Sequence, residues 1–209
     1  MNPIVIPRRR LLRATAAAAA LPALTACDKL GQTLGLSEGF RGMDITGADY
    51  GRDFSLLDAH GQRRTLADFR GKVVQLYFGF TQCPVVCPTA LVKAIETKRL
   101  LGADGERYLV VFITVDPERD TPELLAEYIT AFDPAFVALR PTPDELKKTA
   151  ADFKIYYRAV PTGSSYTMDH SAQAYLFDPQ GRLRVMLRHD QTAQDYAHDV
   201  KLLLAQPAS

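Results

Sequence analysis

The chain has 209 residues, 47% of them hydrophobic, and a formal net charge of +1 at pH 7. This length suits one ordinary domain, and the composition favours a globular core over a disordered or fibrous chain. Basic residues gather only near the N-terminus, at Arg8–Arg10. We therefore expect no nucleic-acid partner, because binding to phosphates needs a concentrated basic face on the folded domain.

Residues 1–26 have the layout of an export signal. The basic run at Arg8–Arg10, loosely similar to a twin-arginine signal, precedes an alanine-rich stretch over 14–23. That stretch is too short to cross a bilayer, which takes about 20 apolar residues. It ends in Leu24-Thr25-Ala26-Cys27, which resembles a bacterial lipobox and would make Cys27 the lipidated first residue of the mature protein. The alternative is a plain cleaved signal with an incidental cysteine.

The segment after Cys27 predicts where the protein resides. Asp28 follows directly, and in many Gram-negative lipoproteins an aspartate at this position marks retention at the inner membrane. Residues 27–50 are rich in glycine and polar residues, which is typical of a flexible tether between lipid and fold. We expect a folded domain over 51–209, held by a lipid anchor at the periplasmic face of a bacterial inner membrane.

From residue 51 the pattern alternates between strands and helices. Continuous apolar and β-branched runs predict strands that are buried on both faces, and Thr-Pro pairs predict the starts of two helices. In chain order we expect a hairpin about the turn Asp58–Gly61, a strand over 72–80, a helix over 88–101, a strand over 108–115, a helix after Thr121, a short strand over 136–139, a helix after Thr142, a hairpin of 171–178 with 183–187, and a helix over 192–204.

This order predicts an α/β fold with a central mixed sheet flanked by helices. A closing hairpin followed by a helix is the ending of a thioredoxin-like fold. Such folds place reactive thiols where the first central strand passes into its helix. Cys83 and Cys87 stand at that point.

Apart from Cys27, the chain has only the thiols of Cys83 and Cys87. Outside the cytoplasm an idle pair would tend to oxidise, and the small loop that it closes would add little stability, so a chemical role is the better interpretation. Pro84 and Pro88 stiffen the segment, and a helix N-terminus lowers the pKa of a cysteine. Thiols four residues apart on a helical turn face the same side. They can cycle between dithiol and disulfide or hold a soft metal, and their spacing leaves both interpretations open.

A third ligand would favour the metal. His60 lies in a predicted turn and His198 on a predicted helix face, both typical of surface residues, while His189 follows the last hairpin and a role near the site stays open. His170 lies at a predicted loop-to-strand junction that packs beside the cysteine loop in a thioredoxin-like fold. Two sulfurs and one nitrogen suit three-coordinate Cu(I), and Cu(II) with a fourth, weaker donor, whereas zinc prefers a closed tetrahedron. Asp169 either orients His170 or caps the following strand.

Three motifs now show a resemblance to a known family. They are FGFTQCPVVCP from Phe78, TVDPERDTPE from Thr114 and DHSAQAYLFDPQGRL from Asp169. Together they resemble the SCO/SenC family of copper-binding proteins that assist cytochrome c oxidase assembly. The resemblance covers the chain from about Gly51 to its C-terminus.

The resemblance implies copper ligands at Cys83, Cys87 and His170 and a thioredoxin-like fold anchored at the extracytoplasmic face. It also implies a partner: the oxidase subunit that carries the binuclear copper site, with other copper carriers beside it. The protein would deliver copper to that subunit or reduce its thiols.

This chain departs from the family pattern at Val85, where an acidic residue is usual. The missing carboxylate removes like-charge repulsion beside the thiolates, which should ease their formation, and it changes the surface offered to a basic partner. Asp116 and Asp120, in the DPERD segment, are interpreted as turn formers and helix caps. A docking role for their loop stays open.

Two hypotheses of function follow, with a copper or redox sensor as a third. The leading one is a copper chaperone, a binding protein rather than an enzyme, in which target ligands displace His170 first because it is the lone neutral donor. The alternative is a thiol-disulfide oxidoreductase in which Cys83 attacks and Cys87 resolves. One dithiol could serve both.

Overall fold

An eight-stranded mixed sheet organises residues 39–206, the part of the chain that the computed structural model describes. Its strand order is β1-β10-β9-β4-β5-β6-β2-β3. The strands are β1 (Met43–Asp44), β2 (Leu56–Asp58), β3 (Arg63–Arg64), β4 (Val73–Gly79), β5 (Tyr108–Thr114), β6 (Val137–Arg140), β9 (Ala174–Phe177) and β10 (Leu183–Leu187). β4, β5 and β6 run parallel to one another, while β9 is antiparallel to β4. The predicted mixed sheet is confirmed.

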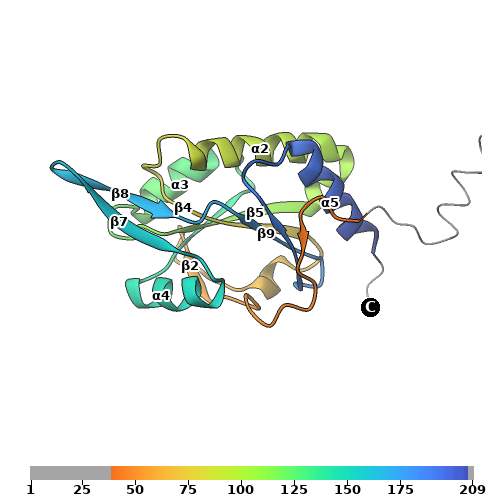
Figure 1. Ribbon diagram of the computed structural model, residues 1–209, viewed down its shortest axis with the longest axis horizontal. Coiled ribbons are helices and arrows are strands. Elements are labelled where there is room, and N and C mark those ends of the chain that lie inside the picture. The colour runs from red at the N-terminus through yellow and green to blue at the C-terminus, as the bar shows by residue number, and fades with distance from the viewer. Residues whose placement is uncertain (1–38, 207–209) are drawn as a thin grey trace, which may run out of the picture. The chain divides into compact units, whose positions relative to one another are not determined.

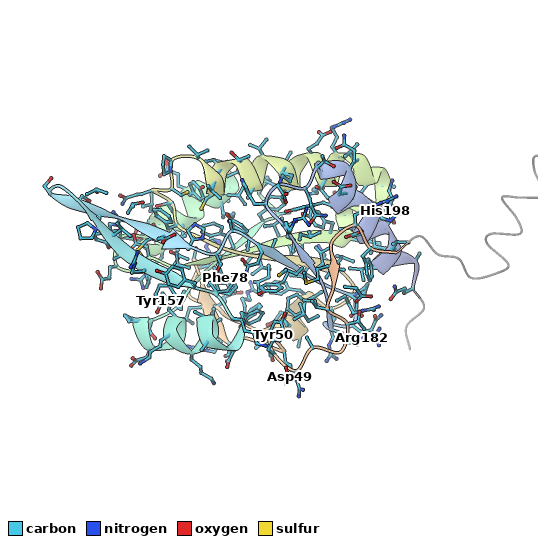
Figure 2. All side chains as sticks on the ribbon, viewed as in Figure 1. Asp49, Tyr50, Phe78, Tyr157, Arg182 and His198 are labelled. Carbon is cyan, nitrogen blue, oxygen red and sulfur yellow. The ribbon has the colours of Figure 1, made fainter. Side chains whose placement is uncertain are left out.

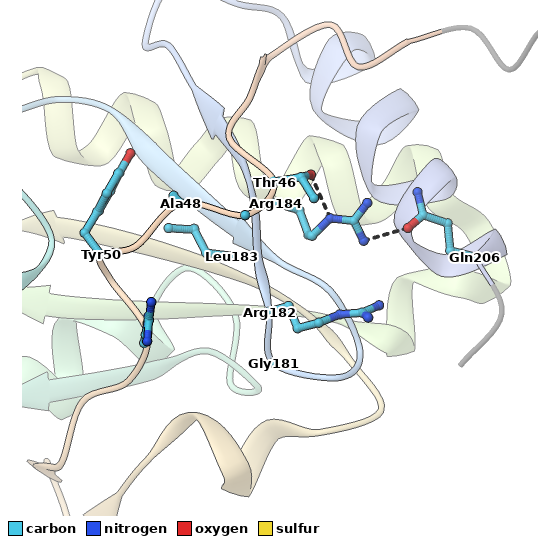
Figure 3. A pocket seen from close by; sticks show the side chains of 10 residues that line it. Thr46, Ala48, Tyr50, Gly181, Arg182, Leu183, Arg184 and Gln206 are labelled. Carbon is cyan, nitrogen blue, oxygen red and sulfur yellow. Dashed lines mark hydrogen bonds between the residues drawn. The ribbon is translucent and has the colours of Figure 1, made fainter. Parts of the chain in front are cut away.

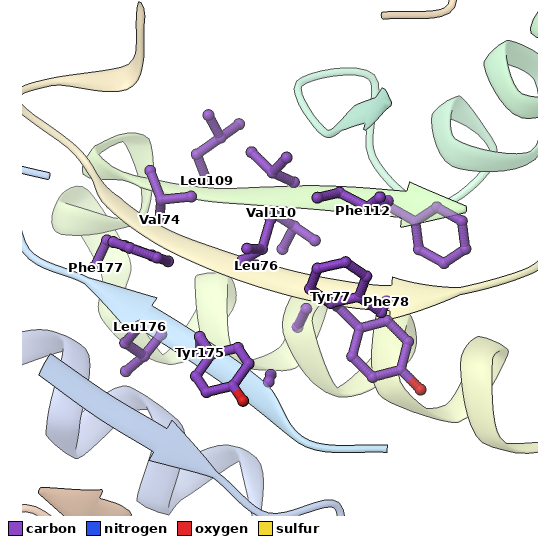
Figure 4. Packing of buried hydrophobic residues seen from close by; sticks show 14 of the residues in the cluster. Val74, Leu76, Tyr77, Phe78, Leu109, Val110, Phe112, Tyr175, Leu176 and Phe177 are labelled. Carbon is purple, nitrogen blue, oxygen red and sulfur yellow. The ribbon is translucent and has the colours of Figure 1, made fainter. Parts of the chain in front are cut away.

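The central strands β4 and β5 are buried along their whole length. Their apolar and β-branched side chains therefore pack on both faces of the sheet, as the continuous hydrophobic runs predict. Figure 4 shows Phe78 of β4, Phe112 of β5 and Phe177 of β9 among the packed side chains. The core thus centres on the strand that leads directly into the cysteine segment.

Helices cover both faces of the sheet. They are α2 (Val86–Leu101), α3 (Pro122–Thr130), α4 (Pro143–Asp152) and α5 (Ala193–Ala205), with two short 3-10 helices, η2 (Leu66–Phe69) and η3 (Gly102–Arg107). In Figure 1, α2, α3 and α5 lie on one side of the sheet and α4 lies on the other. Thr121 and Thr142 cap α3 and α4 through their side chains, with proline at the first helical position, which confirms both predicted helix starts.

The N-terminal boundary of the domain differs from the sequence prediction. Residues 39–50 were assigned to the tether, yet β1 pairs with β10 and extends the sheet. The backbone N–H groups of Arg41 and Gly42 donate to the carboxylate of Asp199 on α5, at 2.7 and 2.8 Å. Glycine-rich composition suggested a tether, but backbone pairing and this buried carboxylate hold the segment on the fold. The predicted signal, Cys27 and the rest of the tether lie outside the described residues.

A second structural difference is a hairpin that stands apart from the main sheet. β7 (Tyr157–Thr162) and β8 (Ser165–His170) pair with each other as a separate two-stranded sheet. The sequence suggested a polar loop here, followed by a strand from 171. His170 instead ends β8, and β9 begins only at Ala174.

Within residues 39–206, no helix has the length and apolar character needed to cross a membrane. A hollow of about 710 Å³ lies beside β10, where Arg184 donates to Thr46 and Gln206 (Figure 3). None of the predicted metal ligands lines this hollow.

Candidate metal centre

Cys83 and Cys87 lie where β4 passes into α2, as predicted. The turn after β4 is closed by the N–H of Cys83, which donates to the carbonyl of Phe80 at 3.3 Å. Cys87 lies in the first turn of α2 and is fully buried, whereas Cys83 is half-buried. A Cβ at Gly79 would stand 2.8 Å from the Cys87 sulfur, so the bare glycine backbone makes room for that thiol.

The sulfur of Cys83 takes the place of a helix cap. Val85 is the N-cap residue of α2 and offers no side-chain hydrogen bond, and 63% of its surface is exposed. The N–H of Cys87, one of the free donors at the helix start, instead donates to the Cys83 sulfur at 3.4 Å. A sulfur in this position is stabilised as the thiolate by the helix N-terminus.

The two thiols differ in acidity. A hydrogen bond from the Cys87 thiol, together with those from the backbone N–H groups of Cys87 and Val85, lowers the pKa of Cys83 to about 4 despite its partial burial. The hydrogen bond to Cys83 and burial raise the pKa of Cys87 far above its ordinary value. At neutral pH the pair therefore carries one negative charge, located on Cys83.

His170 approaches this pair from the end of β8. Its Nε2 lies 3.6 Å from the Cys87 sulfur. Its Nδ1 lies 2.9 Å from the carbonyl oxygen of Ser171, which can only accept, so Nδ1 carries the proton. The imidazole then keeps a lone pair on Nε2, facing the sulfurs. The rings of Tyr77 and Phe80 meet the imidazole edge to face and fix its plane.

The three predicted ligands thus converge. One donor atom each from Cys83, Cys87 and His170 lies within 4.8 Å of the others, and the group could hold a metal ion. Two sulfurs and an imidazole nitrogen form a soft donor set that fits copper.

The remaining predicted residues are not part of this group. Asp169 points away from the imidazole, since neighbouring residues in a strand face opposite sides. Its carboxylate lies 3.9 Å from Arg158, and the Ser171 carbonyl takes the orienting position instead. His60 is exposed in its turn. Figure 2 shows His198 on α5, at the opposite end of the domain from Tyr157 at the start of the hairpin.

His189 remains near the site without joining the ligand group. Lys93 of α2 donates to its backbone carbonyl at 2.5 Å. Burial and the neighbouring Lys93 lower the pKa of the His189 imidazole, while the charges of Asp190 and, to a smaller extent, Cys83 oppose that shift.

Sequence reasoning missed the supporting residues of the site. Gly79, Tyr77 and Phe80 belong to the strand run, and nothing in that pattern separates a residue that touches a thiol from an ordinary core residue. The Ser171 carbonyl has no side-chain signature at all.

Comparison with known proteins identifies the family. A family model described as SCO1/SenC matches residues 43–205. The chain belongs to the SCO1/SenC family. The match begins within the predicted tether, in agreement with the place of β1 in the sheet.

The chain is similar to several SCO1/SenC proteins along most of its length. It is 38% identical over 157 residues to the mitochondrial SCO2 homolog of Mus musculus, which covers 73% of this chain and 62% of the mouse protein. The chain thus spans about three-fifths of that curated relative.

Two solved structures of relatives have copper bound. The Bradyrhizobium japonicum ScoI structure has a TM-score of 0.67 at 38% identity and covers 74% of this chain and 99% of its own. Arabidopsis thaliana ScoI has a TM-score of 0.70 at 33% identity and covers 77% and 100%. These likenesses confirm the predicted thioredoxin-like fold class, and copper in the relatives agrees with the donor set of this chain.

Proposed function

We propose that the protein is a copper-binding metallochaperone whose ligands are Cys83, Cys87 and His170. The convergence of the two sulfurs with the lone-pair nitrogen of His170 carries the proposal. A dithiol alone would suit redox chemistry equally well. A neutral imidazole aimed at the same point adds the third donor that three-coordinate Cu(I) takes.

The burial of the ligands suggests an order of release. Cys87 is fully buried, whereas Cys83 and His170 are partly exposed. An incoming target ligand displaces His170 first, because it is the neutral donor and lies at the end of a hairpin outside the main sheet. Cys87 is the last protein ligand to leave.

The partner and the location follow from the family. We propose that copper passes to the cytochrome c oxidase subunit that carries the binuclear copper site, with other copper carriers as further partners. The protein acts at the periplasmic face of the inner membrane, where Cys27 is its lipid anchor.

The acidity of Cys83 favours a second candidate function, that of a thiol-disulfide oxidoreductase. The Cys83 thiolate attacks a disulfide of the target, forming a mixed disulfide and releasing one target thiolate. Cys87 then gives up its proton and attacks the Cys83 sulfur. The Cys83–Cys87 disulfide forms, the second target thiol leaves, and the target has gained the two electrons that the pair has lost.

One comparison separates the two functions. Cu(I) affinity is measured by competition with a chelator for the wild type, His170→Ala and the matched control His198→Ala. We expect the affinity to fall by orders of magnitude in His170→Ala alone, while the dithiol still reduces a model disulfide. Unchanged copper binding by His170→Ala would refute the three-ligand site.

A further inference from the structure

The segment between β5 and α3, residues 116–120, contacts both halves of the candidate site; we call it the bracket loop. It is folded on itself, with the N–H of Asp120 donating to the carbonyl of Asp116 at 2.9 Å. Arg140 of β6 donates to the carbonyl oxygens of Asp120 and Pro117, at 2.9 and 2.6 Å. The loop is thereby fixed to the main sheet.

One end of the bracket loop holds the cysteine segment. Asp120 is fully buried, and its carboxylate accepts the N–H of Thr81 at 3.2 Å and the Thr81 hydroxyl at 2.6 Å. The hydroxyl of Thr114, at the end of β5, donates to the same carboxylate. Thr81 lies two residues before Cys83, so these bonds fix the start of the turn that presents the thiols.

The other end holds the hairpin that carries His170. The buried carboxylate of Asp116 accepts the hydroxyl of Tyr166 at 2.9 Å and pairs with Arg119. Arg119 also donates to the carbonyl of Tyr166 at 2.7 Å, and its guanidinium lies 3.7 Å from the centre of the Tyr166 ring. Tyr166 is on β8, four residues before His170. This one residue is held at its hydroxyl, its ring and its backbone carbonyl.

The hairpin needs such a tether. β7 and β8 pair only with each other among the described strands, and an isolated two-stranded hairpin is at best marginally stable in water. A hollow of about 270 Å³ lies beneath it, lined by Tyr166 and Met168 of β8, Tyr157 of β7, and Leu146 of α4. Tyr157 and Met168 also pack against the core, so the bonds from the bracket loop add to that packing in holding the hairpin.

We propose that the bracket loop sets the distance between the cysteine pair and His170. Asp116 and Arg119 position His170 through Tyr166, and Asp120 positions Cys83 through Thr81. None of these five positioning residues is among the proposed copper ligands. The proposal rests on the proposed three-ligand copper site, and it gives the two aspartates a function beyond capping and turn formation.

A double-mutant cycle tests whether Tyr166 positions His170. Tyr166→Phe removes one hydroxyl and keeps the ring. We expect it to weaken Cu(I) binding about 3- to 10-fold in the wild-type background, the size of one hydrogen bond. In the His170→Ala background it should have no effect, because the residue that Tyr166 positions has been removed.

The contact between Asp120 and Thr81, beside the cysteine pair, should behave differently in the same cycle. Thr81→Val also removes one hydroxyl and is expected to weaken Cu(I) binding in both backgrounds, because the segment that Thr81 fixes to Asp120 carries Cys83, which is present in both. The matched control is Tyr175→Phe, which loses a buried hydrogen bond of 2.8 Å to the Phe153 carbonyl. It should leave copper affinity unchanged in both backgrounds.

Amide hydrogen exchange provides a readout without copper. In the apo protein, the amides of β8 should exchange faster in Tyr166→Phe than in the wild type, and at the wild-type rate in Tyr175→Phe. Arg119→Gln should likewise increase the exchange, since it removes the bond to the Tyr166 carbonyl and the contact with the Tyr166 ring.

Two results would overturn the proposal: an equal loss of affinity from Tyr166→Phe in both backgrounds, or unchanged exchange in β8. If His170→Ala itself binds copper like the wild type, the proposed function fails instead. The amide-exchange measurement then tests, without copper, whether the bracket loop holds the hairpin.

Discussion

At the scale of single residues, Cys83 and Cys87 differ in burial and in acidity, although both side chains are thiols. Cys87 is buried against Gly79 and keeps its proton, whereas Cys83 is half-exposed and receives several donors. The same asymmetry serves both candidate functions. A buried ligand retains the metal until the last exchange, and an exposed thiolate attacks first.

The reactivity of Cys83 should depend on pH in an unusual range. Because hydrogen bonds lower its pKa to about 4, we expect its alkylation by iodoacetamide to proceed at a constant rate from pH 8 down to about pH 5. Below about pH 4 most of the thiolate is protonated, and the rate falls about tenfold per pH unit. Mass spectrometry of the peptide that contains Cys83 follows the reaction.

The denatured chain is the control, since its thiols should react with an ordinary midpoint near 8.5. Cys87→Ala removes the largest cause of the shift and should raise the pKa of Cys83. A midpoint above pH 7 in the folded wild type would contradict the assigned hydrogen bonds.

At the scale of elements, the N-terminal strand depends on one side chain of α5. Asp199 accepts the N–H groups of both Arg41 and Gly42, and it is fully buried. The short strand β1 has only two residues, so its pairing with β10 alone is weak. The link to α5 therefore decides whether this segment stays on the sheet.

Asp199→Ala should detach the segment before β2. We expect the free energy of unfolding to fall by about 1–3 kcal/mol, the cost of leaving such donors unpaired. Limited proteolysis should then cut within residues 39–50. Glu127→Ala, an exposed carboxylate on α3, is the matched control and should change neither quantity. Resistance to proteolysis in Asp199→Ala would show that β1 holds by itself.

The elements also show how much the sequence could predict. Strands β4 and β5 were recoverable because full burial produces an unbroken apolar run. The β7–β8 hairpin was not, because its half-exposed residues show no clean alternation. Cys83 and Cys87 were found through their spacing and expected compartment, and His170 through its predicted place in the fold and the family resemblance. The buried hydrogen bonds between Asp120 and Thr81 join segments far apart in the chain. Local turn patterns account for an aspartate at position 120, but they do not predict these bonds.

At the scale of the whole domain, copper would join parts that the fold connects only weakly. Two ligands belong to the start of α2 and the third to a hairpin outside the main sheet. A ligand that binds only the folded chain stabilises it by mass action, by about 2.7 kcal/mol at a free concentration 100 times its Kd.

Thermal unfolding should therefore shift upward on addition of Cu(I) to the wild type, by about 2–4 °C per kcal/mol for a domain of this size. Cys87→Ala should lose nearly all of this shift, and His170→Ala most of it. His60→Ala, which alters an exposed turn, should keep it. Equal shifts in all four proteins would indicate that copper binds elsewhere.

The separation of the ligands along the chain determines when the site can exist. Cys87 and His170 are 83 positions apart, and β9, which completes the sheet beside β4, follows both. Contacts so distant in sequence form late in folding, after the entropy of closing the intervening loop has been overcome. A chain that is still unfolded has these two thiols but no imidazole beside them. Metal capture is thus tied to the finished fold, and a copper-loaded protein is one that has completed its folding.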